Sequence, residues 1–371
     1  MIDHYLSEDT LATVLLCGGL GGDAGSPSPL TLREWNGLVR SLIRANWRPG
    51  DLVHAGSAAT AAALELAAPF TERIETLLGQ GVTVATALEK LATQGITVLS
   101  RADEAYPSRL RTRLKDQSPP LLFCAGPITL FERAGVAAVG SRDVDPTGTE
   151  FAAQVGLYAA QAGVVLISGG ARGVDRVAMA GALEAGGEAI GILPDGLAKL
   201  LRSPEIRNWV AEGQLLLTSP FRPNSRFEVW KAMERNKLIY GLAEFAFVVS
   251  SDADKGGTWT GATENLKRDW APLLVRDGEN VPGGNRRLID LGGIPVTAPT
   301  LAELREPDLL AGLQRLVQNQ AAAHSYLQPA LPGESEPGSR PRRLETTTAK
   351  DPGKMSAARP GTGEQLTFRF D

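Results

Sequence analysis

The chain has 371 residues and a formal net charge of −4, and 43% of its residues are hydrophobic and 22% are charged. This composition is typical of a globular protein, and no apolar run approaches the roughly 20 residues that cross a membrane, so we expect a cytoplasmic protein without a membrane segment. The negative charge excludes a general attraction to nucleic acid, which would therefore need a local basic face. The cysteines, Cys17 and Cys124, indicate buried thiols, and the scattered histidines predict no metal site.

Residues 1–115 are predicted to form a small, mainly helical N-terminal domain that recognises a partner or dimerises. Helical apolar spacing occurs in residues 10–22, 30–47, 61–68 and 70–95, and a short strand is expected at 96–100. Thr31 is a candidate N-cap for the second of these helices. Its apolar face is predicted to comprise Leu32, Trp35, Leu38, Leu42 and Ile43.

Residues 116–304 alternate between apolar runs and helical spacing, which predicts an α/β domain. After a first strand at 121–126, strands are expected at 136–140, 164–168, 189–193, 215–219, 245–251 and 272–276. The intervening helices are expected to begin near Gly148, Val174, Pro204, Arg226 and Thr260. Strands that are apolar throughout fit a sheet covered on both faces, so we predict an extended Rossmann-like, doubly wound parallel sheet.

The end of the chain changes in composition. Residues 305–327 are expected to form a C-terminal helical segment. Residues 328–371 are rich in Pro, Gly, Ser, Arg and Glu, so we expect a disordered tail. It ends in an apolar motif, Gln365–Phe370, that would suit docking to a partner protein.

Glycine-rich turns follow several predicted strands, at the sheet edge where ligands of open parallel sheets bind. Small residues let a backbone approach a phosphate, and helix N-termini favour anions. The candidate phosphate-binding residues in these turns are Gly140, Ser141, Arg142, Ser168, Gly169, Gly170, Arg172, Gly173, Lys255, Gly256, Gly257 and Thr258. Neither a dinucleotide fingerprint nor a Walker lysine motif occurs, so hydride transfer and NTP hydrolysis are poorly supported.

Basic residues cluster in this predicted domain, notably in residues 222–237, and would extend a phosphate site along several nucleotides. Stacking surfaces could come from Phe227, Trp230, Tyr240 or Trp259, although each alone is more typical of a core. Asp175 could favour a helix dipole or orient Arg172, with a general base as the weaker alternative. Glu264 is either catalytic or solvent-facing, and no nucleophile–base pair is evident.

Five segments occur in an order that resembles the DNA-processing protein DprA (Smf) family: VAAVGSR (136–142), LISGGARGVDRVAMAGALEAGG (166–187), RNKLIYGLAE (235–244), the loop Gly256–Glu264 and GGNRRLIDLGG (283–293). The resemblance covers roughly residues 100–300. It implies single-stranded DNA binding and protection, help in loading a RecA-type recombinase, a homodimer through the Rossmann domain, and no catalysis, cofactor or metal. It places Arg142, Arg235, Asn236, Lys237 and the loop 168–175 in the DNA pocket. Arg142→Ala and Lys237→Ala are therefore each expected to weaken DNA binding.

The chain also departs from the family pattern. Met179 and Ala180 stand where the family usually has histidine and often arginine, residues 193–196 and 255–262 differ from the usual loops, and no C-terminal winged-helix pattern occurs. A role in transformation, repair or defence against foreign DNA stays open. A nucleotide sensor or phosphoribohydrolase-like enzyme using Gly256, Gly257 and Glu264 is the alternative.

Overall fold

The computed structural model describes residues 6–22, 26–304 and 308–327. The chain divides between Asn319 and Gln320 into two units, and the first of them contains the sheet and its covering helices. No helix in the described ranges is both long and apolar enough to cross a bilayer. The predicted tail, residues 328–371, and its motif Gln365–Phe370 lie outside the described residues.

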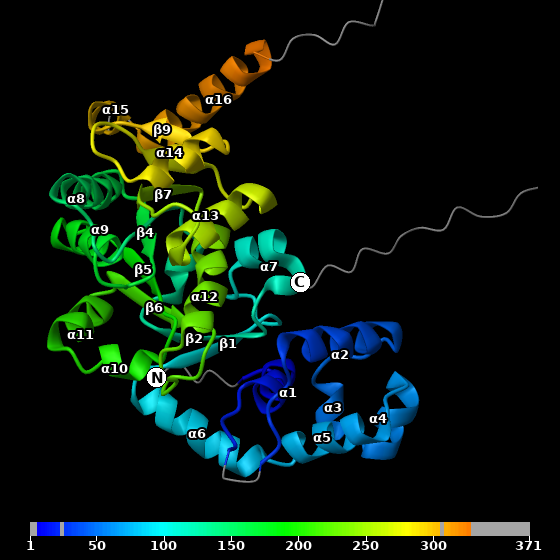
Figure 1. Cartoon of the computed structure of the whole chain (residues 1–371). Coiled ribbons are helices and arrows are strands. Elements are labelled where there is room, and N and C mark those ends of the chain that lie inside the picture. Colours follow the sequence, from blue (N-terminus) through cyan, green and yellow to red (C-terminus); the bar gives the residue numbers. More distant parts are fainter. Residues whose placement is uncertain (1–5, 23–25, 305–307, 328–371) are drawn as a thin grey trace, which may run out of the picture. The chain divides into compact units, whose positions relative to one another are not determined.

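A nine-stranded sheet organises the first unit, in the order β1-β2-β6-β5-β4-β3-β7-β8-β9 (Figure 1). The strands are β1 (Thr97–Ser100), β2 (Leu121–Ala125), β3 (Gly135–Gly140), β4 (Val165–Ser168), β5 (Ala189–Ile192), β6 (Leu215–Ser219), β7 (Phe245–Ser250), β8 (Leu273–Arg276) and β9 (Ile294–Val296). β1 pairs antiparallel with β2, and β2 antiparallel with β6, whereas β3 to β9 pair in parallel. The six strands predicted after residue 135 are confirmed, and β9 was not predicted.

The chain winds in two directions from β3, which confirms the predicted doubly wound sheet. It passes from β3 outward through β4 and β5 to β6, and then returns to the other side of β3 as β7. The strand order therefore reverses between β3 and β7. In open parallel sheets this reversal opens a crevice at the carboxyl ends of the strands, where ligands bind.

Helices cover both faces of the sheet (Figure 1). The helices after β2 are α8 (Pro146–Gln161), α9 (Val174–Glu184), α10 (Leu197–Leu200), α11 (Pro204–Ala211), α12 (Val229–Leu242), α13 (Gly256–Arg268), α14 (Gly283–Asp290), α15 (Ala298–Leu304) and α16 (Leu309–Leu327), with a 3-10 turn at Ile128–Glu132. Successive side chains of β3 point to opposite faces of the sheet and therefore pack in different hydrophobic cores. Val136 and Ala138 join the core of α8 and α9, whereas Ala137 and Val139 join the core of α12.

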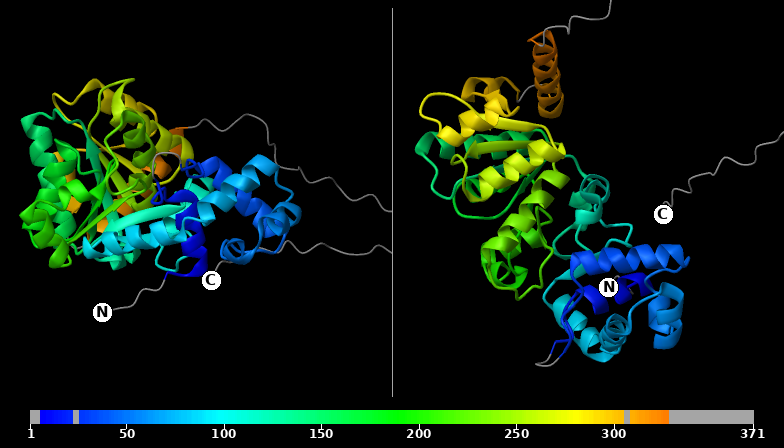
Figure 2. Two further views of the ribbon diagram at one scale, coloured as in Figure 1. Left: turned by 90° about the horizontal axis from the view of Figure 1, so that it is seen from below. Right: turned by 45° about the vertical axis from the view of Figure 1, so that its right-hand side comes forward.

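The N-terminal helices enclose a small core of their own (Figure 2). They are α1 (Glu8–Cys17), α2 (Leu32–Arg44), α3 (Asp51–His54), α4 (Ser57–Leu64) and α5 (Ala68–Leu78). The next helix, α6 (Gly81–Thr93), packs Val84 and Leu91 in the main core instead, and after β1 come α7 (Ser108–Leu114) and a 3-10 turn at Lys115–Gln117. Thr31 caps α2 in a capping box with Glu34, as predicted. The prediction that Ile43 faces the core is wrong, because its side chain is exposed. The helix predicted over 61–68 is interrupted at Glu65, which adopts a left-handed conformation.

Hydrogen bonds connect α1 to the sheet. The Thr10 hydroxyl lies 2.8 Å from that of Ser100 at the end of β1, and it donates to Asp103. The Arg222 guanidinium donates to the carbonyl oxygen of Gly19 over 2.9 Å. β1 itself pairs with β2 and so belongs to the sheet, although it lies within residues 1–115, which we expected to form a mainly helical domain.

An ion pair fixes the start of α8 beside β8. Arg276 is buried, and it donates from Nη2 to Asp145 Oδ2 over 2.6 Å and from Nη1 to Oδ1 over 3.1 Å. Asp145 also caps α8 by accepting from the Gly148 N–H at 2.8 Å. The Arg276 hydrogen bonds hold the pKa of the Asp145 carboxyl well below its usual range, with smaller contributions from Thr147 and Gly148.

We expect Arg276→Met to lower the free energy of unfolding by about 1–2 kcal/mol near neutral pH, allowing for solvent screening of the partly exposed carboxylate. Because the folded-state pKa of Asp145 is lowered, its stabilisation is present above the unfolded-state pKa and is lost as pH falls. Urea unfolding should therefore show the difference between variant and wild type shrinking in acid. A difference that grows in acid would contradict this account.

Candidate nucleic-acid interface

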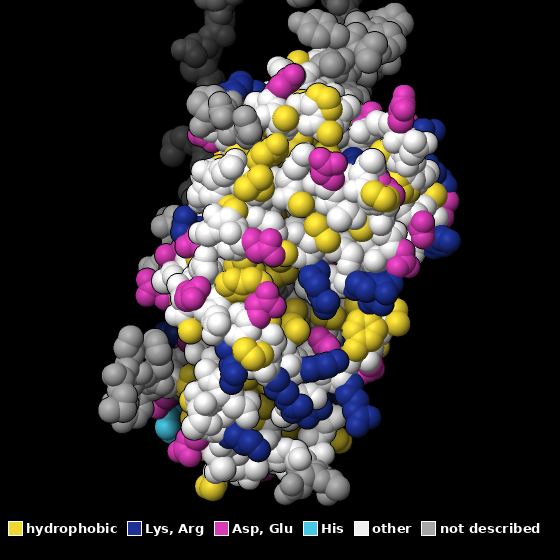
Figure 3. Space-filling model, turned by 90° about the vertical axis from the view of Figure 1, so that its left-hand side faces the viewer, with side chains coloured by type: hydrophobic (Ala, Val, Ile, Leu, Met, Phe, Trp, Pro, Cys, Tyr) yellow, Lys and Arg dark blue, Asp and Glu magenta, His cyan; other side chains and the backbone are white. Residues whose placement is uncertain are grey.

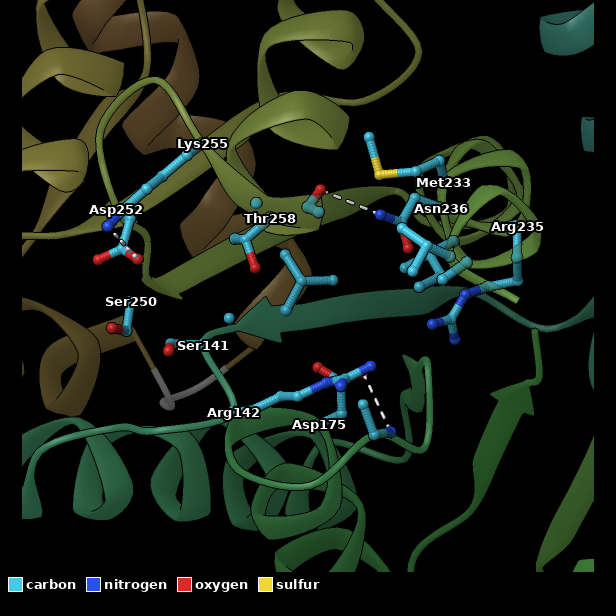
Figure 4. A pocket seen from close by; sticks show the side chains of 18 of the residues that line it. Ser141, Arg142, Asp175, Met233, Arg235, Asn236, Ser250, Asp252, Lys255 and Thr258 are labelled. Atoms are coloured by element: carbon cyan, nitrogen blue, oxygen red, sulfur yellow. Dashed lines mark hydrogen bonds and ion pairs between the residues drawn. The ribbon is translucent and has the colours of Figure 1, made fainter. Parts of the chain in front are cut away.

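A cavity of about 400 Å³ lies at the carboxyl ends of β3 and β7, where the strand order reverses. We call it the β3–β7 cavity. Figure 4 shows Arg142 and Asp175 on one side of it, and Asn236 and Arg235 of α12 on another. Its lining residues are Val139, Gly140, Ser141, Arg142, Ala171, Asp175, Phe227, Val229, Ala232, Met233, Arg235, Asn236, Ile239, Tyr240, Ser250, Asp252, Lys255, Gly256, Gly257 and Thr258. The volume falls in the range of about 300–1,000 Å³ that is usual for ligand sites.

The first predicted loop presents an accessible arginine to this cavity. Gly140 ends β3, and the Ser141 N–H donates to the Ser250 carbonyl oxygen at 2.9 Å, which holds the loop against β7. The Arg142 side chain is exposed, and its guanidinium carbon lies 5.4 Å from the centre of the Phe227 ring. Within the described ranges, Arg142 forms no ion pair. Its charge is therefore available to an anionic ligand.

The second predicted loop supports the first loop more than it lines the cavity. Gly173 has φ +88°, and a Cβ atom there would lie 2.6 Å from the Arg142 carbonyl oxygen. The buried Ser168 hydroxyl donates to the Ala138 carbonyl oxygen over 2.7 Å. Gly169 lies beside Arg235, and Gly170, with φ +66°, lines a different cavity. The loop residue Ala171 does reach the β3–β7 cavity.

Gly173→Ala should disturb the first loop, because the added methyl group meets the backbone of Ser141 and Arg142 in a conformation that L-residues rarely adopt. We expect it to lower the free energy of unfolding by about 1–3 kcal/mol. Thermal unfolding would measure this loss. Gly186→Ala is a matched control, since Gly186 also has a positive φ but has open space around its Cβ position. Equal losses in the two variants would show that the backbone conformation, and not contact with the first loop, sets the cost.

Arg172 lies outside the β3–β7 cavity. Its Nη2 donates to Asp143 Oδ1 over 2.5 Å, and its side chain is 70% exposed. The alternative in which Asp175 orients Arg172 is wrong, because Arg172 pairs with Asp143 instead. Asp175 and Arg235 approach each other beside Gly169.

Asp175 and Arg235 are the buried charged residues of the cavity lining, with only 6% and 4% of their surfaces exposed. Burial raises the pKa of Asp175 to about 6, although Arg235 and backbone N–H groups, including that of Ala171, act in the opposite direction. Burial also lowers the pKa of Arg235, and Asp175 and Asp195 oppose that shift. Arg235 donates from Nη1 to the Ile192 carbonyl oxygen, but its buried Nε has no partner. A buried, incompletely paired guanidinium therefore borders the cavity.

The start of α13 forms another wall. The structure begins this helix at Gly256, whereas the sequence placed its start near Thr260, so Gly256, Gly257 and Thr258 lie in the first turn. The Asn236 side-chain amide donates to the Gly257 carbonyl oxygen over 3.0 Å and joins α12 to α13. Lys255 is exposed, 3.8 Å from Asp252 Oδ2. A helix N-terminus carries partial positive charge, so this wall also favours an anion.

Lys237 does not lie with the other predicted site residues. Its Nζ pairs with Glu234 Oε2 at 2.6 Å, and its side chain is 11% exposed. It lines a separate groove, with Pro119 and Lys231, on the other side of α12. Arg235 and Lys237 are two residues apart on a helix with about 3.6 residues per turn, so their side chains diverge by roughly 200°. The sequence motif therefore sends one basic residue to each side of α12.

Of the four aromatic candidates, Phe227 is the one that is both exposed, at 44%, and part of the cavity lining. Tyr240 lines the cavity but is buried, and Trp259 lies beside Arg287, with 5.5 Å from the ring centre to the guanidinium carbon. Trp230 is exposed and donates to Glu228 over 2.6 Å in the groove that contains Lys237.

The prediction of site residues missed Met233, Ser250 and Asp252, which line the cavity. Ser250 and Asp252 could have been found from their position at the end of a predicted strand, whereas Met233 carries no polar signal. Glu264, the candidate catalytic residue, is absent from the cavity lining, and no metal-holding group of His, Cys, Asp and Glu side chains was found in the described part of the chain.

Comparison with known proteins assigns the chain to a protein family. The family model described as DNA recombination-mediator protein A matches residues 97–293. The DNA processing protein DprA of Bacillus subtilis is 26% identical over 204 residues, covering 54% of this chain and 67% of the relative. Protein Smf of Escherichia coli is 29% identical over 200 residues, covering 53% of each chain.

The fold also resembles that of a solved relative. The X-ray structure of DNA processing protein A from Streptococcus pneumoniae has a TM-score of 0.60 and 19% sequence identity, and the match covers 80% of this chain and 97% of that chain. The chain belongs to the DNA recombination-mediator protein A family.

Proposed function

We propose that this chain is a non-enzymatic protein of the cytoplasm that binds single-stranded DNA at the β3–β7 cavity. The observation that carries the proposal is the exposed Arg142, free of ion pairs in the described ranges and stacked near Phe227. A guanidinium binds a phosphate through charge-assisted hydrogen bonds, and an exposed aromatic ring offers a base a stacking surface. A single strand supplies both groups.

The proposal favours a single strand over a duplex because a base can stack on Phe227 only when it has left its own base stack. The first turn of α13 and Lys255 would contribute further positive potential along the sugar–phosphate backbone. We assign Arg142, Lys255 and the Gly256–Thr258 turn to phosphate contact. Gly140, Ser141, Ser168, Gly169, Gly170 and Gly173 shape the two loops, and Arg235 and Asn236 position α12.

The family description, recombination mediator, supports a role in which the bound strand is protected and handed to a RecA-type recombinase. A homodimer formed through the Rossmann domain would place two such cavities on one assembly. We propose both as consequences of DNA binding in uptake, repair or defence against foreign DNA. A second candidate function is the hydrolysis of a nucleoside monophosphate, because the β3–β7 cavity is about the size of a nucleotide. Asp175 would be its ionisable group, since Asp175 lines this cavity and Glu264 does not.

Fluorescence anisotropy with a labelled single strand, a duplex of the same sequence and a mononucleotide competitor would test the proposed function. We expect the single strand to bind most tightly, and its affinity to fall steeply as salt is raised, because each neutralised phosphate releases counterions. Stronger competition by the mononucleotide than by the oligonucleotide, or release of a free base, would overturn the proposal in favour of the enzyme alternative. Equal affinity for duplex and single strand would remove the role assigned to Phe227.

A further inference from the structure

A second cavity, of about 360 Å³, lies beneath α11 and shares no lining residue with the first. We call it the α11 cavity. Its walls come from α9, α11 and the β5–β6 part of the sheet, and they are mainly apolar, with Met179, Leu183, Leu193, Ile206, Trp209 and Leu217 among them. None of the α11 residues is fully buried, although Ile206 and Trp209 pack partly against the main core. The helix therefore covers a hollow that its own side chains leave unfilled.

The two cavities flank the same loop. Ala171 lines the β3–β7 cavity, whereas its neighbour Gly170 lines the α11 cavity. In the same way, Asp175 lines the β3–β7 cavity and its neighbour Arg176 lines the α11 cavity. A ligand that extends across this loop can therefore reach both cavities.

Exposed basic side chains lie in the lining of the α11 cavity or near lining residues along the chain. Arg176 belongs to its lining, and Lys199, Arg202 and Arg207 lie on α10, on the turn after it and on α11. The described structure assigns none of these four cations an ion pair, in contrast to Arg172 and Lys237. Glu184 and Glu205 are the acidic residues of the lining. Figure 3 shows the side of the molecule where α9 and α11 lie, with Lys and Arg side chains gathered around apolar ones over its lower half.

We propose that a single DNA strand held at Arg142 continues across the loop at residues 169–173 and inserts a base into the α11 cavity. This inference rests on the proposed function. Arg176, which lines the cavity, and Arg202, which is next to the lining residue Ser203, would contact phosphates, and the Trp209 ring would pack against the inserted base. The indole N–H of Trp209 has no hydrogen-bond partner among the described residues, so it is free to donate to a base. Mostly apolar walls recognise a base without strong sequence preference.

A strand accounts for these features better than an acidic peptide does. A peptide that adds to a sheet needs an open strand edge, but β5 and β6, which line this region, are both paired on each side. A polynucleotide needs only spaced phosphates and one unstacked base, and both are matched by separate cations around an apolar hollow.

The number of phosphate contacts would test the inference. We would compare wild type with the Arg176→Ala/Arg202→Ala double variant, using one oligonucleotide of about 3 nucleotides and one of about 12 nucleotides. For the longer strand, the slope of log affinity against log salt should become shallower by about 1.4, since each phosphate contact in a single strand contributes about 0.7. For the shorter strand, which we expect to bind at Arg142 without reaching the α11 cavity, the slope should not change.

The matched control is Lys267→Ala/Arg268→Ala, which removes two exposed cations from α13, outside both cavity linings. It should leave both slopes unchanged. If the Arg176/Arg202 variant binds the longer strand as wild type does while Arg142→Ala still weakens it, the α11 cavity plays no part and the proposed function survives. If wild type binds neither strand, the proposed function itself fails.

Base insertion has its own test at Trp209. Trp209→Ala should weaken binding of the longer strand about tenfold, whereas Trp209→Phe should keep most of the affinity because it retains an aromatic face. On a strand whose internal nucleotides are abasic, the two variants should bind alike. An equal loss for Trp209→Ala on normal and abasic strands would mean that the residue only supports α11, and would overturn base insertion.

Discussion

Arg142→Ala is expected to weaken single-stranded DNA binding by about tenfold to a hundredfold, whereas Lys237→Ala should change it less than about twofold. A hydrogen bond to a charged group contributes about 1.5–3 kcal/mol, and Arg142 stands exposed on the β3–β7 cavity without an ion pair in the described ranges. Lys237 is held by Glu234 in the groove on the other side of α12. Titrations at several salt concentrations would measure both effects, and the Arg142 variant should also lose part of the salt dependence.

Arg142→Lys separates charge from shape at this position. It keeps the cation but loses the planar group that lies 5.4 Å from the Phe227 ring centre and can bind a phosphate through two parallel hydrogen bonds. We therefore expect an affinity between those of wild type and Arg142→Ala. If Lys237→Ala proved as damaging as Arg142→Ala, the strand would have to run through the groove that contains Lys237, and the assignment to the β3–β7 cavity would be wrong.

Much of the fold could be predicted because its strands are buried on both faces. Runs such as residues 136–139 and 245–249 are apolar at every position, and Gly140 and Ser250 follow them. The edge strand β9, only Ile294–Val296, is too short to stand out from its surroundings. The break between α4 and α5 depends on a left-handed Glu65, a conformation for which glutamate gives no sequence signal.

The loops of the candidate site could also be predicted, since the ends of parallel strands meet at one sheet edge. The direction of individual side chains could not. Arg172 and Arg142 look equivalent in the sequence, yet Asp143 pairs with Arg172 and leaves Arg142 accessible. Such pairing is a property of the folded chain. The DNA-pocket role implied for Lys237 stays a prediction, and its position across α12 from the cavity argues against it.

Arg235→Met is expected to lower the free energy of unfolding by about 3–5 kcal/mol near neutral pH, the largest stability loss that we foresee. The substitution leaves the Asp175 carboxylate buried without its cation. Double replacement, Asp175→Asn with Arg235→Met, should recover part of this loss because no buried charge then remains. Urea unfolding of the single and double variants would measure the difference.

The free energy of unfolding that Arg235→Met loses should increase as pH rises. The pKa of Asp175 is raised from 3.8 to about 6 in the folded protein. The stability that this shift contributes is therefore fully present below the pKa of the unfolded chain, and it is lost as pH rises through the pKa of the folded protein. Without Arg235, which opposes this shift, the folded-state pKa rises further, and destabilisation continues to grow at higher pH. Arg235→Met should therefore differ less from wild type near about pH 5 than near about pH 8. A constant difference across this range would mean that Arg235 stabilises the fold by packing, and that its charge contributes nothing through Asp175.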